Sequence, residues 1–293
     1  MLFDEATLRK ITRLSLVATQ VRAGMLKGER RSVKRGSSLE FADYRNYTPG
    51  DDLRRLDWKV YGRLDRPFLK LFEAEEDLAV HVLLDASQSM DWGEGEANKF
   101  LYAQKLAAAL GAIALATGDQ FTVMFLRGAG GSPALGPLRG QPNTLRLFQF
   151  LESQRPAGTT SLNRSLRDYA LAAHRPGLVF LISDLFSSGG YQPGLSHLQR
   201  RGNEVALIHL LSPSEIDPPL SGDLRLVDVE TGHAQEVSLD SGLRGLYRRR
   251  LQAWRDEIEG YCRKRAIHFL AAVTNTPWDK IILQEMRRAA LVH

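Results

Sequence analysis

One carboxylate and two hydroxyls follow an apolar run at a spacing that can bring their oxygens together. The run 79–85 ends on Asp85, and Ser87 and Ser89 come two and four residues later. In a loop that leaves a strand, alternate side chains can point to one place, and hard oxygen ligands suit Mg²⁺ or Mn²⁺ better than zinc. Asp and Ser are also common in turns and helix caps, so this spacing alone does not distinguish a metal site from a turn.

A second hydroxyl-bearing loop and a second carboxylate occur at comparable places later in the chain. Gly158, Thr159 and Thr160 lie just before a predicted helix, and Asp184 ends another apolar run at 178–184. Each feature alone is typical of a helix cap or a turn. Taken together with Asp85, they are what a six-coordinate oxygen site needs from neighbouring loops.

Strands and helices must alternate to place these loops at one edge of a sheet. The predicted strands are 79–85, 120–126, 178–184, 203–211 and 266–273, and the predicted helices are 97–117, 143–154, 161–174, 191–201, 241–265 and a last one from Trp278. Continuous apolar runs are typical of strands buried on both faces of a parallel sheet. We therefore predict an α/β fold, a doubly wound and mainly parallel Rossmann-type sheet flanked by helices. Ligands bind such sheets at the carboxyl ends of the strands, where the strand order reverses.

Two shorter regions depart from this alternation. The segments 224–229 and 235–239 can form a strand pair. The first quarter is predicted to contain a helix at 4–25, extended backbone near Leu39 and Phe41, a short helix capped by Asp51 or Asp52, and a strand at 67–72. We thus predict a helical and extended appendage at 1–77 that packs on a core domain at 78–293.

The net charge of +5 lies entirely in the first 75 residues. Residues 1–75 contain 16 basic and 11 acidic residues, whereas the rest of the chain contains 23 of each. The basic residues Arg30, Arg31, Lys34 and Arg35 lie close together and form a candidate surface for an acidic partner.

Composition excludes several classes of protein. The chain is 43% hydrophobic and 25% charged, which is typical of globular proteins and not of disordered or collagen-like ones. The single cysteine, Cys262, cannot form an intramolecular disulfide. The apolar run 106–116 is about half as long as a membrane-spanning helix, and the N-terminus does not resemble a signal peptide. We expect a cytoplasmic protein without membrane insertion.

Two motif sets resemble known families. DASQSM, GTT and LISD on alternating strands and helices resemble the von Willebrand factor A domain with its metal-ion-dependent adhesion site. The string LEFADYRNYTPGDDLRRLDWKVYGRLDRPFLKLFEAEED at residues 39–77 is similar to the bacterial family called domain of unknown function fifty-eight, in its soluble short form.

These resemblances imply a site and a function. The implied ligands of Mg²⁺ (or Mn²⁺) are Asp85, Ser87, Ser89, Thr159 and Asp184, and Thr160 is an alternative to Thr159. A partner protein is expected to supply an acidic residue to the metal. The second family further implies cooperation with a MoxR-type AAA+ ATPase in chaperone-like assembly or activation of other proteins. We therefore expect a protein-protein interaction module that is not an enzyme.

Two other functions stay open. The basic segment, with Tyr44, Tyr47 and Trp58 nearby, can in principle bind nucleic acid, although acidic residues interrupt it. Asp85 can in principle act as the nucleophile of a phosphoryl-transfer or hydrolytic enzyme. The chain has no G-x-x-x-x-G-K-[ST], G-x-G-x-x-G or G-x-S-x-G motif, and Ser87 stands where related phosphatases carry a second acid. We therefore favour binding over both.

Overall fold

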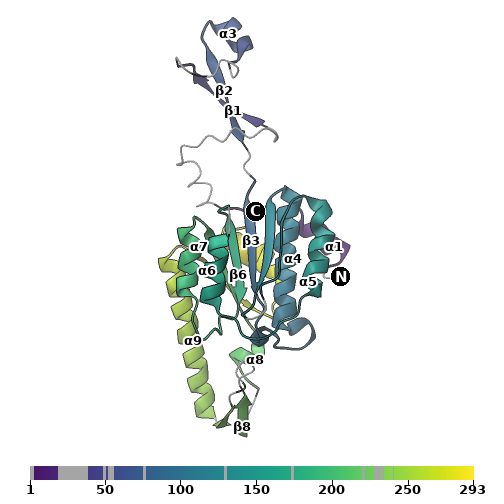
Figure 1. The fold of residues 1–293 in the computed structure, drawn as a ribbon, viewed down its shortest axis with the longest axis vertical. Helices are drawn as coiled ribbons and strands as arrows, with labels where there is room; N and C mark the ends of the chain where they lie inside the picture. Colours follow the sequence, from purple (N-terminus) through teal and green to yellow (C-terminus); the bar gives the residue numbers. More distant parts are fainter. Residues whose placement is uncertain are drawn as a thin grey trace. The chain divides into compact units, whose positions relative to one another are not determined.

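The structure is a computed structural model, and it forms two compact units. It describes residues 3–18, 39–48, 51, 56–74, 77–128, 131–172, 175–219, 222–227, 232, 234–239 and 241–293 (Figure 1). One unit, the core unit, comprises residues 1–28 and 78–293, and the other comprises residues 29–77.

A six-stranded sheet forms the centre of the core unit. Its strands are β3 (Ala79–Asp85), β4 (Gln120–Leu126), β5 (Ala134–Leu138), β6 (Leu178–Ser183), β7 (Glu204–Leu211) and β10 (His268–Val273). Their order is β10-β7-β6-β3-β4-β5, and every neighbouring pair is parallel except β4 with β5. The prediction of a doubly wound, mainly parallel sheet is confirmed. The antiparallel edge strand β5 was not predicted, because its sequence, ALGPL, contains Gly and Pro.

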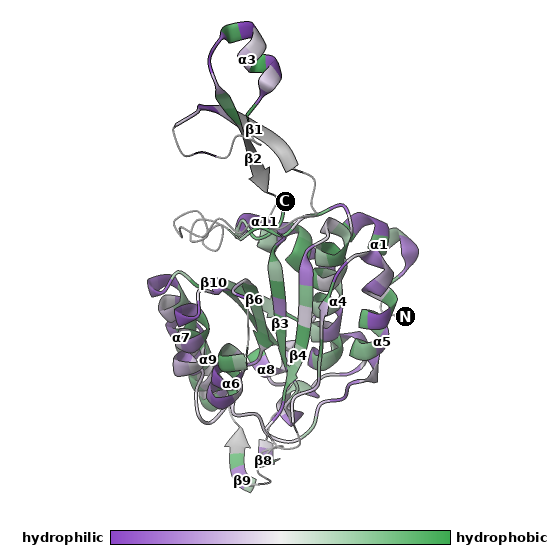
Figure 2. Ribbon diagram, turned by 45° about the horizontal axis from the view of Figure 1, so that its top comes forward, coloured by the Kyte–Doolittle hydropathy of each residue, from purple (hydrophilic) through white to green (hydrophobic). Residues whose placement is uncertain are grey.

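Helices cover both faces of this sheet (Figure 1). The helices are α1 (Glu5–Ile11), α4 (Lys99–Thr117), α5 (Thr144–Ser153), α6 (Leu162–Ala172), α7 (Gln192–Arg200), α8 (Pro213–Ile216), α9 (Ser241–Lys264), α10 (Trp278–Lys280) and α11 (Met286–Arg288), with short turns η2 (Gln88–Met90), η3 (Gly95–Ala97), η4 (Gln141–Asn143) and the π-helical η5 (Ile281–Glu285). One buried apolar cluster joins the sheet to α1, α4, α5 and the C-terminal helices, and a second joins it to α6, α7 and α9. Figure 2 shows hydrophobic strands β3 and β6 between helices with hydrophilic outer faces.

Helix α4 is apolar on almost all sides because protein surrounds it. The Asn98 side chain accepts a hydrogen bond from the Leu101 N–H at its start, and Gly118 adopts a left-handed conformation at its end. Within the described residues it is the one helix long and apolar enough to cross a bilayer, and 78% of its apolar stretch is buried inside the protein. One buried position of α4, Lys99, is charged.

The N-terminal helix is shorter than the sequence predicted. Helix α1 ends at Ile11, whereas the sequence predicted a helix over 4–25; residues 14–18 instead run alongside the C-terminus, where Leu16 pairs with Val292. Their alternate residues Leu14, Leu16 and Ala18 are buried, which is the period-two pattern of extended backbone and not that of a helix. Since residues 1–28 belong to the core unit, the boundary also differs from the predicted appendage at 1–77. That residues 29–77 pack on the core stays a prediction.

The second unit contains a strand pair and one helix. Strands β1 (Leu39–Asn46) and β2 (Phe68–Ala74) are antiparallel, and helix α3 (Trp58–Leu64) lies between them in sequence. Asp57 caps α3 and also accepts a hydrogen bond from the Tyr44 hydroxyl at 2.9 Å. The helix thus begins later than the predicted cap at Asp51 or Asp52.

A hairpin and a long helix extend the core unit beyond the sheet. Strands β8 (Gly222–Val227) and β9 (Ala234–Leu239) are antiparallel, close to the predicted pair, and α9 follows them. Arg248 of α9 forms an ion pair with Asp217, just after α8. Helix α9 is therefore tied to the segment that follows α8.

A buried histidine joins β3 to α6. The Tyr169 hydroxyl lies 2.6 Å from His81 Nδ1, and the two rings meet edge to face. Burial lowers the pKa of His81 from 6.5 to about 4, because the charged imidazolium loses its hydration. His81 is therefore a core histidine.

This histidine makes the stability of the fold depend on pH. In the unfolded chain His81 takes up a proton near pH 6.5, and in the folded chain only near pH 4. The stabilisation that His81 gives the folded state is therefore complete above pH 6.5 and is lost as the pH falls toward 4. We expect His81 to contribute about 3 kcal/mol to this loss. Urea unfolding between pH 7 and 4.5 should give a shallower pH dependence for His81→Gln than for wild type. Identical slopes for the two proteins would contradict the assignment.

Candidate functional site

The candidate site lies where the strand order of the sheet reverses. After β3 the chain passes to β4 on one side, and it later returns to β6 on the other side of β3. Leu84 of β3 pairs with Ile182 of β6, so Asp85 and Asp184 leave the sheet side by side at its carboxyl edge. Loops at this place of a doubly wound sheet commonly form ligand sites.

The loop after β3 brings the three predicted oxygen ligands together. The Ser87 N–H donates to Asp85 Oδ1 at 3.1 Å, and the hydroxyls of Ser87 and Ser89 lie 3.0 Å apart. Asp85 and Ser87 are buried, and Ser89 is partly exposed. The three groups therefore face one place at the edge of the protein, as their spacing predicted.

The loop containing the two threonines lies beside this first loop. The Gln88 N–H donates to the Gly158 carbonyl at 2.8 Å, and the Ala157 N–H donates to the Ala86 carbonyl at 2.9 Å. Thr160 is buried, and its hydroxyl donates to the Leu126 carbonyl. Thr159 is exposed, and its hydroxyl has no hydrogen bond within the described part of the chain. Of the two, Thr159 therefore has the hydroxyl that is available to a ligand.

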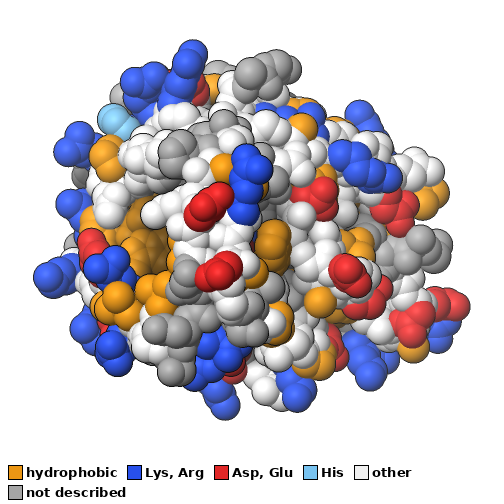
Figure 3. Space-filling view, turned by 90° about the horizontal axis from the view of Figure 1, so that it is seen from below, with side chains coloured by type: hydrophobic (Ala, Val, Ile, Leu, Met, Phe, Trp, Pro, Cys, Tyr) orange, Lys and Arg blue, Asp and Glu red, His pale blue; other side chains and the backbone are white. Residues whose placement is uncertain are grey.

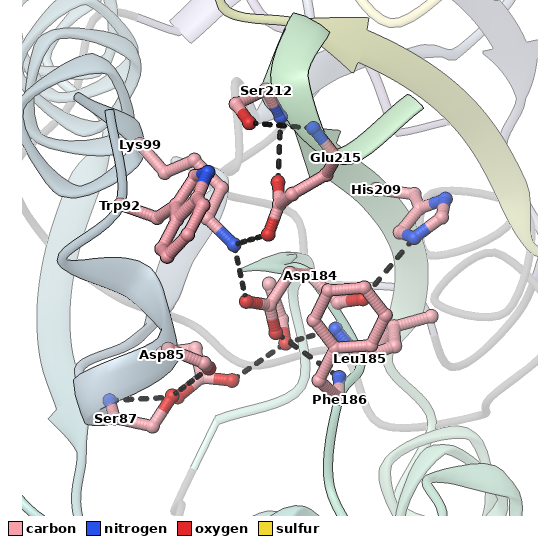
Figure 4. Close-up of polar contacts among 12 residues, drawn as sticks. Asp85, Ser87, Trp92, Lys99, Asp184, Leu185, Phe186, His209, Ser212 and Glu215 are labelled. Atoms are coloured by element: carbon pink, nitrogen blue, oxygen red, sulfur yellow. Dashed lines mark hydrogen bonds and ion pairs between the residues drawn. The ribbon is translucent and has the colours of Figure 1, made fainter. Parts of the chain in front are cut away.

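Asp184 is in the site but is already engaged. Its Oδ1 accepts from the Phe186 N–H at 3.0 Å, and its Oδ2 lies 2.7 Å from the Lys99 ammonium. The same ammonium lies 2.6 Å from Glu215 Oε1 (Figure 4). Lys99 thus bridges a carboxylate of the sheet edge and a carboxylate of α8.

Ser183 links the ends of β3 and β6 directly. Its hydroxyl donates to Asp85 Oδ2 at 2.6 Å and accepts from the Leu185 N–H at 2.9 Å. Asp85 is therefore hydrogen-bonded at both oxygens.

The site carries more negative charge than positive charge. Burial raises the pKa of Asp85, and the neighbouring charge of Asp184 raises it further, while hydrogen bonds from Ser183 and Ser87 oppose the change. The ammonium of Lys99 pairs with two carboxylates, those of Asp184 and Glu215, and the Asp85 carboxylate beside Asp184 has no ammonium partner among the described contacts. With all of these groups ionised, the site has a net charge of about −2, which a divalent cation neutralises.

Aromatic side chains border the charged groups. The Trp92 indole donates from Nε1 to Ser214 of α8 at 3.0 Å, and the Phe186 ring stacks on Trp254 of α9. Lys99 Nζ lies 5.4 Å from the centre of the Phe186 ring. Trp92 and Phe186 remain 48% and 42% exposed. This face therefore offers apolar surface next to the site.

Lys99 and Glu215 were missed by the sequence analysis. Lys99 begins an apolar helix, and nothing in the local sequence pairs it with Asp184. Glu215 belongs to the string Ser212-Pro213-Ser214-Glu215, and it forms a capping box with Ser212 at the start of α8. That string could have located the helix but not its role in the site.

The predicted partner surface falls on a segment that the structure does not describe. Arg30, Arg31, Lys34 and Arg35 lie outside the described residues.

Among the residues that are described, no group of three or more His, Cys, Asp or Glu is arranged to hold a metal ion. A metal at this site therefore depends on the serine and threonine oxygens as well as on carboxylates.

Comparison with known proteins identifies the family. The profile described as "Protein of unknown function DUF58" matches residues 43–257. The chain belongs to this family. Two similar proteins are the uncharacterized proteins Rv1480 of Mycobacterium tuberculosis and Mb1516 of Mycobacterium bovis, each 29% identical over 284 residues, which cover 95% of this chain and 89% of the relative.

Solved structures include two similar bacterial proteins. The conserved hypothetical protein BatB of Bacteroides thetaiotaomicron is 15% identical with a TM-score of 0.45, covering 73% of this chain and 98% of its own. An aerotolerance-related membrane protein of Bacteroides fragilis is 16% identical with a TM-score of 0.45, covering 72% and 99%. Likeness of this extent carries no inference about the site.

Ser183 provides a test of the site geometry. Ser183→Ala removes the hydrogen bond to buried Asp85, and the free energy of unfolding should fall by about 1–3 kcal/mol. Ser153→Ala is the matched control, because its hydroxyl donates to the Phe150 carbonyl on an exposed helix end, and it should change stability by less than about 0.5 kcal/mol. Urea unfolding measures both, and equal effects would contradict the bridging role of Ser183.

Proposed function

We propose that this DUF58 protein is a non-catalytic protein-protein interaction module of the von Willebrand A type. Asp85, Ser87, Ser89 and Thr159 are the proposed ligands of Mg²⁺ or Mn²⁺, with Asp184 as the fifth group of the site. The observation that carries the proposal is the pair of carboxylates, Asp85 and Asp184, beside two serine hydroxyls at the reversal of strand order.

The donor set fits a hard divalent cation. Asp85 supplies a carboxylate, and the paired hydroxyls of Ser87 and Ser89 are neutral oxygen ligands. When bound, Mg²⁺ supplies a positive centre with an open position for one more anionic oxygen. An Asp or Glu side chain of a partner protein is suited to that position.

The surroundings of the site favour binding over catalysis. A hydrolase needs a general base beside its reacting atoms. His209 is the described histidine in contact with the site, and its Nε2 lies 3.2 Å from the Asp184 carbonyl. Burial lowers the pKa of His209 to about 4, and its ring packs edge to face against Trp254. An imidazole packed in this way is poorly placed to exchange protons with a substrate.

Metal binding should appear as metal-dependent stability. Wild-type protein should gain about 2.7 kcal/mol of unfolding free energy at a Mg²⁺ concentration one hundred times the dissociation constant, relative to EDTA. Asp85→Asn should gain nothing from Mg²⁺, and in EDTA it should stay within about 1 kcal/mol of wild type, because it also loses the repulsion from Asp184. Chemical unfolding with and without Mg²⁺ measures both.

The two threonines supply the matched controls. Thr159→Ala should weaken the Mg²⁺-dependent gain without loss of stability in EDTA. Thr160→Val should lower stability in both conditions, because it removes the hydrogen bond to the Leu126 carbonyl, but it should keep the gain from Mg²⁺. A wild-type protein that is insensitive to Mg²⁺ and Mn²⁺ would overturn the proposed site.

The face around the site suits an acidic partner. Arg249 and Arg250 are exposed on α9, and the neighbouring Tyr247 hydroxyl donates to the Glu215 carbonyl. Figure 3 views the molecule from below, the side at which α8 and β8 lie in Figure 1, and apolar patches are bordered there by Lys and Arg side chains. Following the family resemblance, we propose a MoxR-type AAA+ ATPase as the partner in a chaperone-like role; the chain's lack of a phosphate-loop motif supports a division of labour.

The partnership can be tested with purified proteins. The MoxR-type ATPase of the same organism should co-elute with the full chain in Mg²⁺ and ATP. Co-elution should be lost with Asp85→Asn, which leaves the Mg²⁺ of the ATPase untouched. Retention of the complex by this variant would show that the contact does not pass through the site, and a charge reversal at Arg249 and Arg250 would then test the basic surface separately.

A further inference from the structure

Lys99 is a cation enclosed within the protein. Its side chain is fully buried, and its ammonium lies 2.7 Å from Asp184 and 2.6 Å from Glu215. Burial of a charged amine is unfavourable unless charged partners compensate for the lost hydration. Two carboxylates provide this compensation here, so the position of Lys99 depends on both.

Asp184 is the group that Lys99 has in common with the proposed metal site. One of its oxygens accepts a hydrogen bond from the Phe186 N–H, and the other accepts one from the Lys99 ammonium (Figure 4). A metal ion held by Asp85, Ser87 and Ser89 therefore shares the charge of Asp184 with an ammonium that repels it. In a buried site this repulsion is only weakly screened.

We propose that Lys99 is the resident cation of the site, that it competes with a divalent metal for Asp184, and that Glu215 limits this competition by holding Lys99 on α8. This inference rests on the proposed metal site. It assigns to Lys99 and Glu215 opposite effects on metal affinity: Lys99 lowers the affinity, and Glu215 raises it.

The contacts of Glu215 and its neighbours link Lys99 to residues at the protein surface. Glu215 closes the capping box of α8 through the Ser212 N–H at 2.7 Å, and the adjacent Ser214 accepts the indole N–H of Trp92. When Asp184 also binds a metal ion, the ammonium group of Lys99 moves away from Asp184 and toward Glu215. Helix α8 and the half-exposed Trp92 then respond to metal occupancy, so a partner that contacts this face can distinguish the two states.

Two single substitutions test the competition by the sign of their effects. Titration calorimetry of the full chain with MgCl₂, after EDTA treatment, should give an affinity at least about tenfold higher for Lys99→Met than for wild type, because the repelling charge is gone. Glu215→Gln should lower the Mg²⁺ affinity several-fold. In this variant Asp184 is the remaining carboxylate partner of Lys99, so the ammonium neutralises Asp184 more completely. Lys105→Met is the control: Lys105 lies on the same helix and pairs with exposed Glu96, so the affinity should not change.

A double variant covers the case in which Lys99→Met does not fold. Lys99→Met with Glu215→Gln removes one charge of each sign, and it should bind Mg²⁺ more tightly than Glu215→Gln alone. Circular dichroism checks the fold of every variant, and the difference in tryptophan fluorescence between each protein and its Trp92→Phe counterpart follows α8 during the titration.

The outcomes separate this inference from the proposed function. If wild type binds Mg²⁺ but removal of Lys99 leaves the affinity equal or lower, or if both single variants change it in the same direction, the competition is overturned and the metal site stands. If neither wild type nor the variants without Lys99 bind Mg²⁺ or Mn²⁺, both ideas are overturned. Tighter binding without Lys99 supports the competition.

Discussion

Asp85 and Asp184 bring like charges together at the ends of two adjacent buried strands, and the surrounding structure compensates for their repulsion. The parallel pairing of β3 with β6 makes their proximity unavoidable. Ser183 donates a hydrogen bond to one carboxylate, and Lys99 forms an ion pair with the other. Without such partners, burial of two carboxylates would destabilise the fold by several kcal/mol. A cation bound between the two carboxylates would therefore reduce their repulsion.

Several distant parts of the chain contribute side chains to this compensation. Helix α4 brings Lys99, α8 brings Glu215, and α9 supports α8 through the Arg248–Asp217 ion pair. The apolar core does not need these charges, since the sheet is already covered on both faces. Charged networks of this kind add little to stability and are retained where a site needs them. This is the physical basis for proposing the carboxyl edge of the sheet as the functional face.

The sequence predicted the sheet better than it predicted the ends of the chain or the charges within the site. Buried strands such as β3 and β6 are long apolar runs, which few other structures produce. The segment after Ile11 was predicted wrongly as a helix, because its apolar residues recur at three- and four-residue intervals, whereas the buried ones, Leu14, Leu16 and Ala18, alternate along an extended segment that pairs with Val292. The Asp85, Ser87 and Ser89 cluster was predictable because its spacing is local. The Lys99–Glu215 contact was not, because it joins residues 116 positions apart that share no local pattern.

The central claim is that a divalent cation binds at the paired carboxyl ends of β3 and β6. Anomalous diffraction from crystals of the full chain grown with Mn²⁺ tests it most directly. We predict one anomalous peak in inner-sphere contact, at about 2.1 Å, with an Asp85 oxygen and the hydroxyls of Ser87 and Ser89. A fully occupied Lys99–Asp184 ion pair with no peak beside Asp85, in crystals that contain millimolar Mn²⁺, would contradict it.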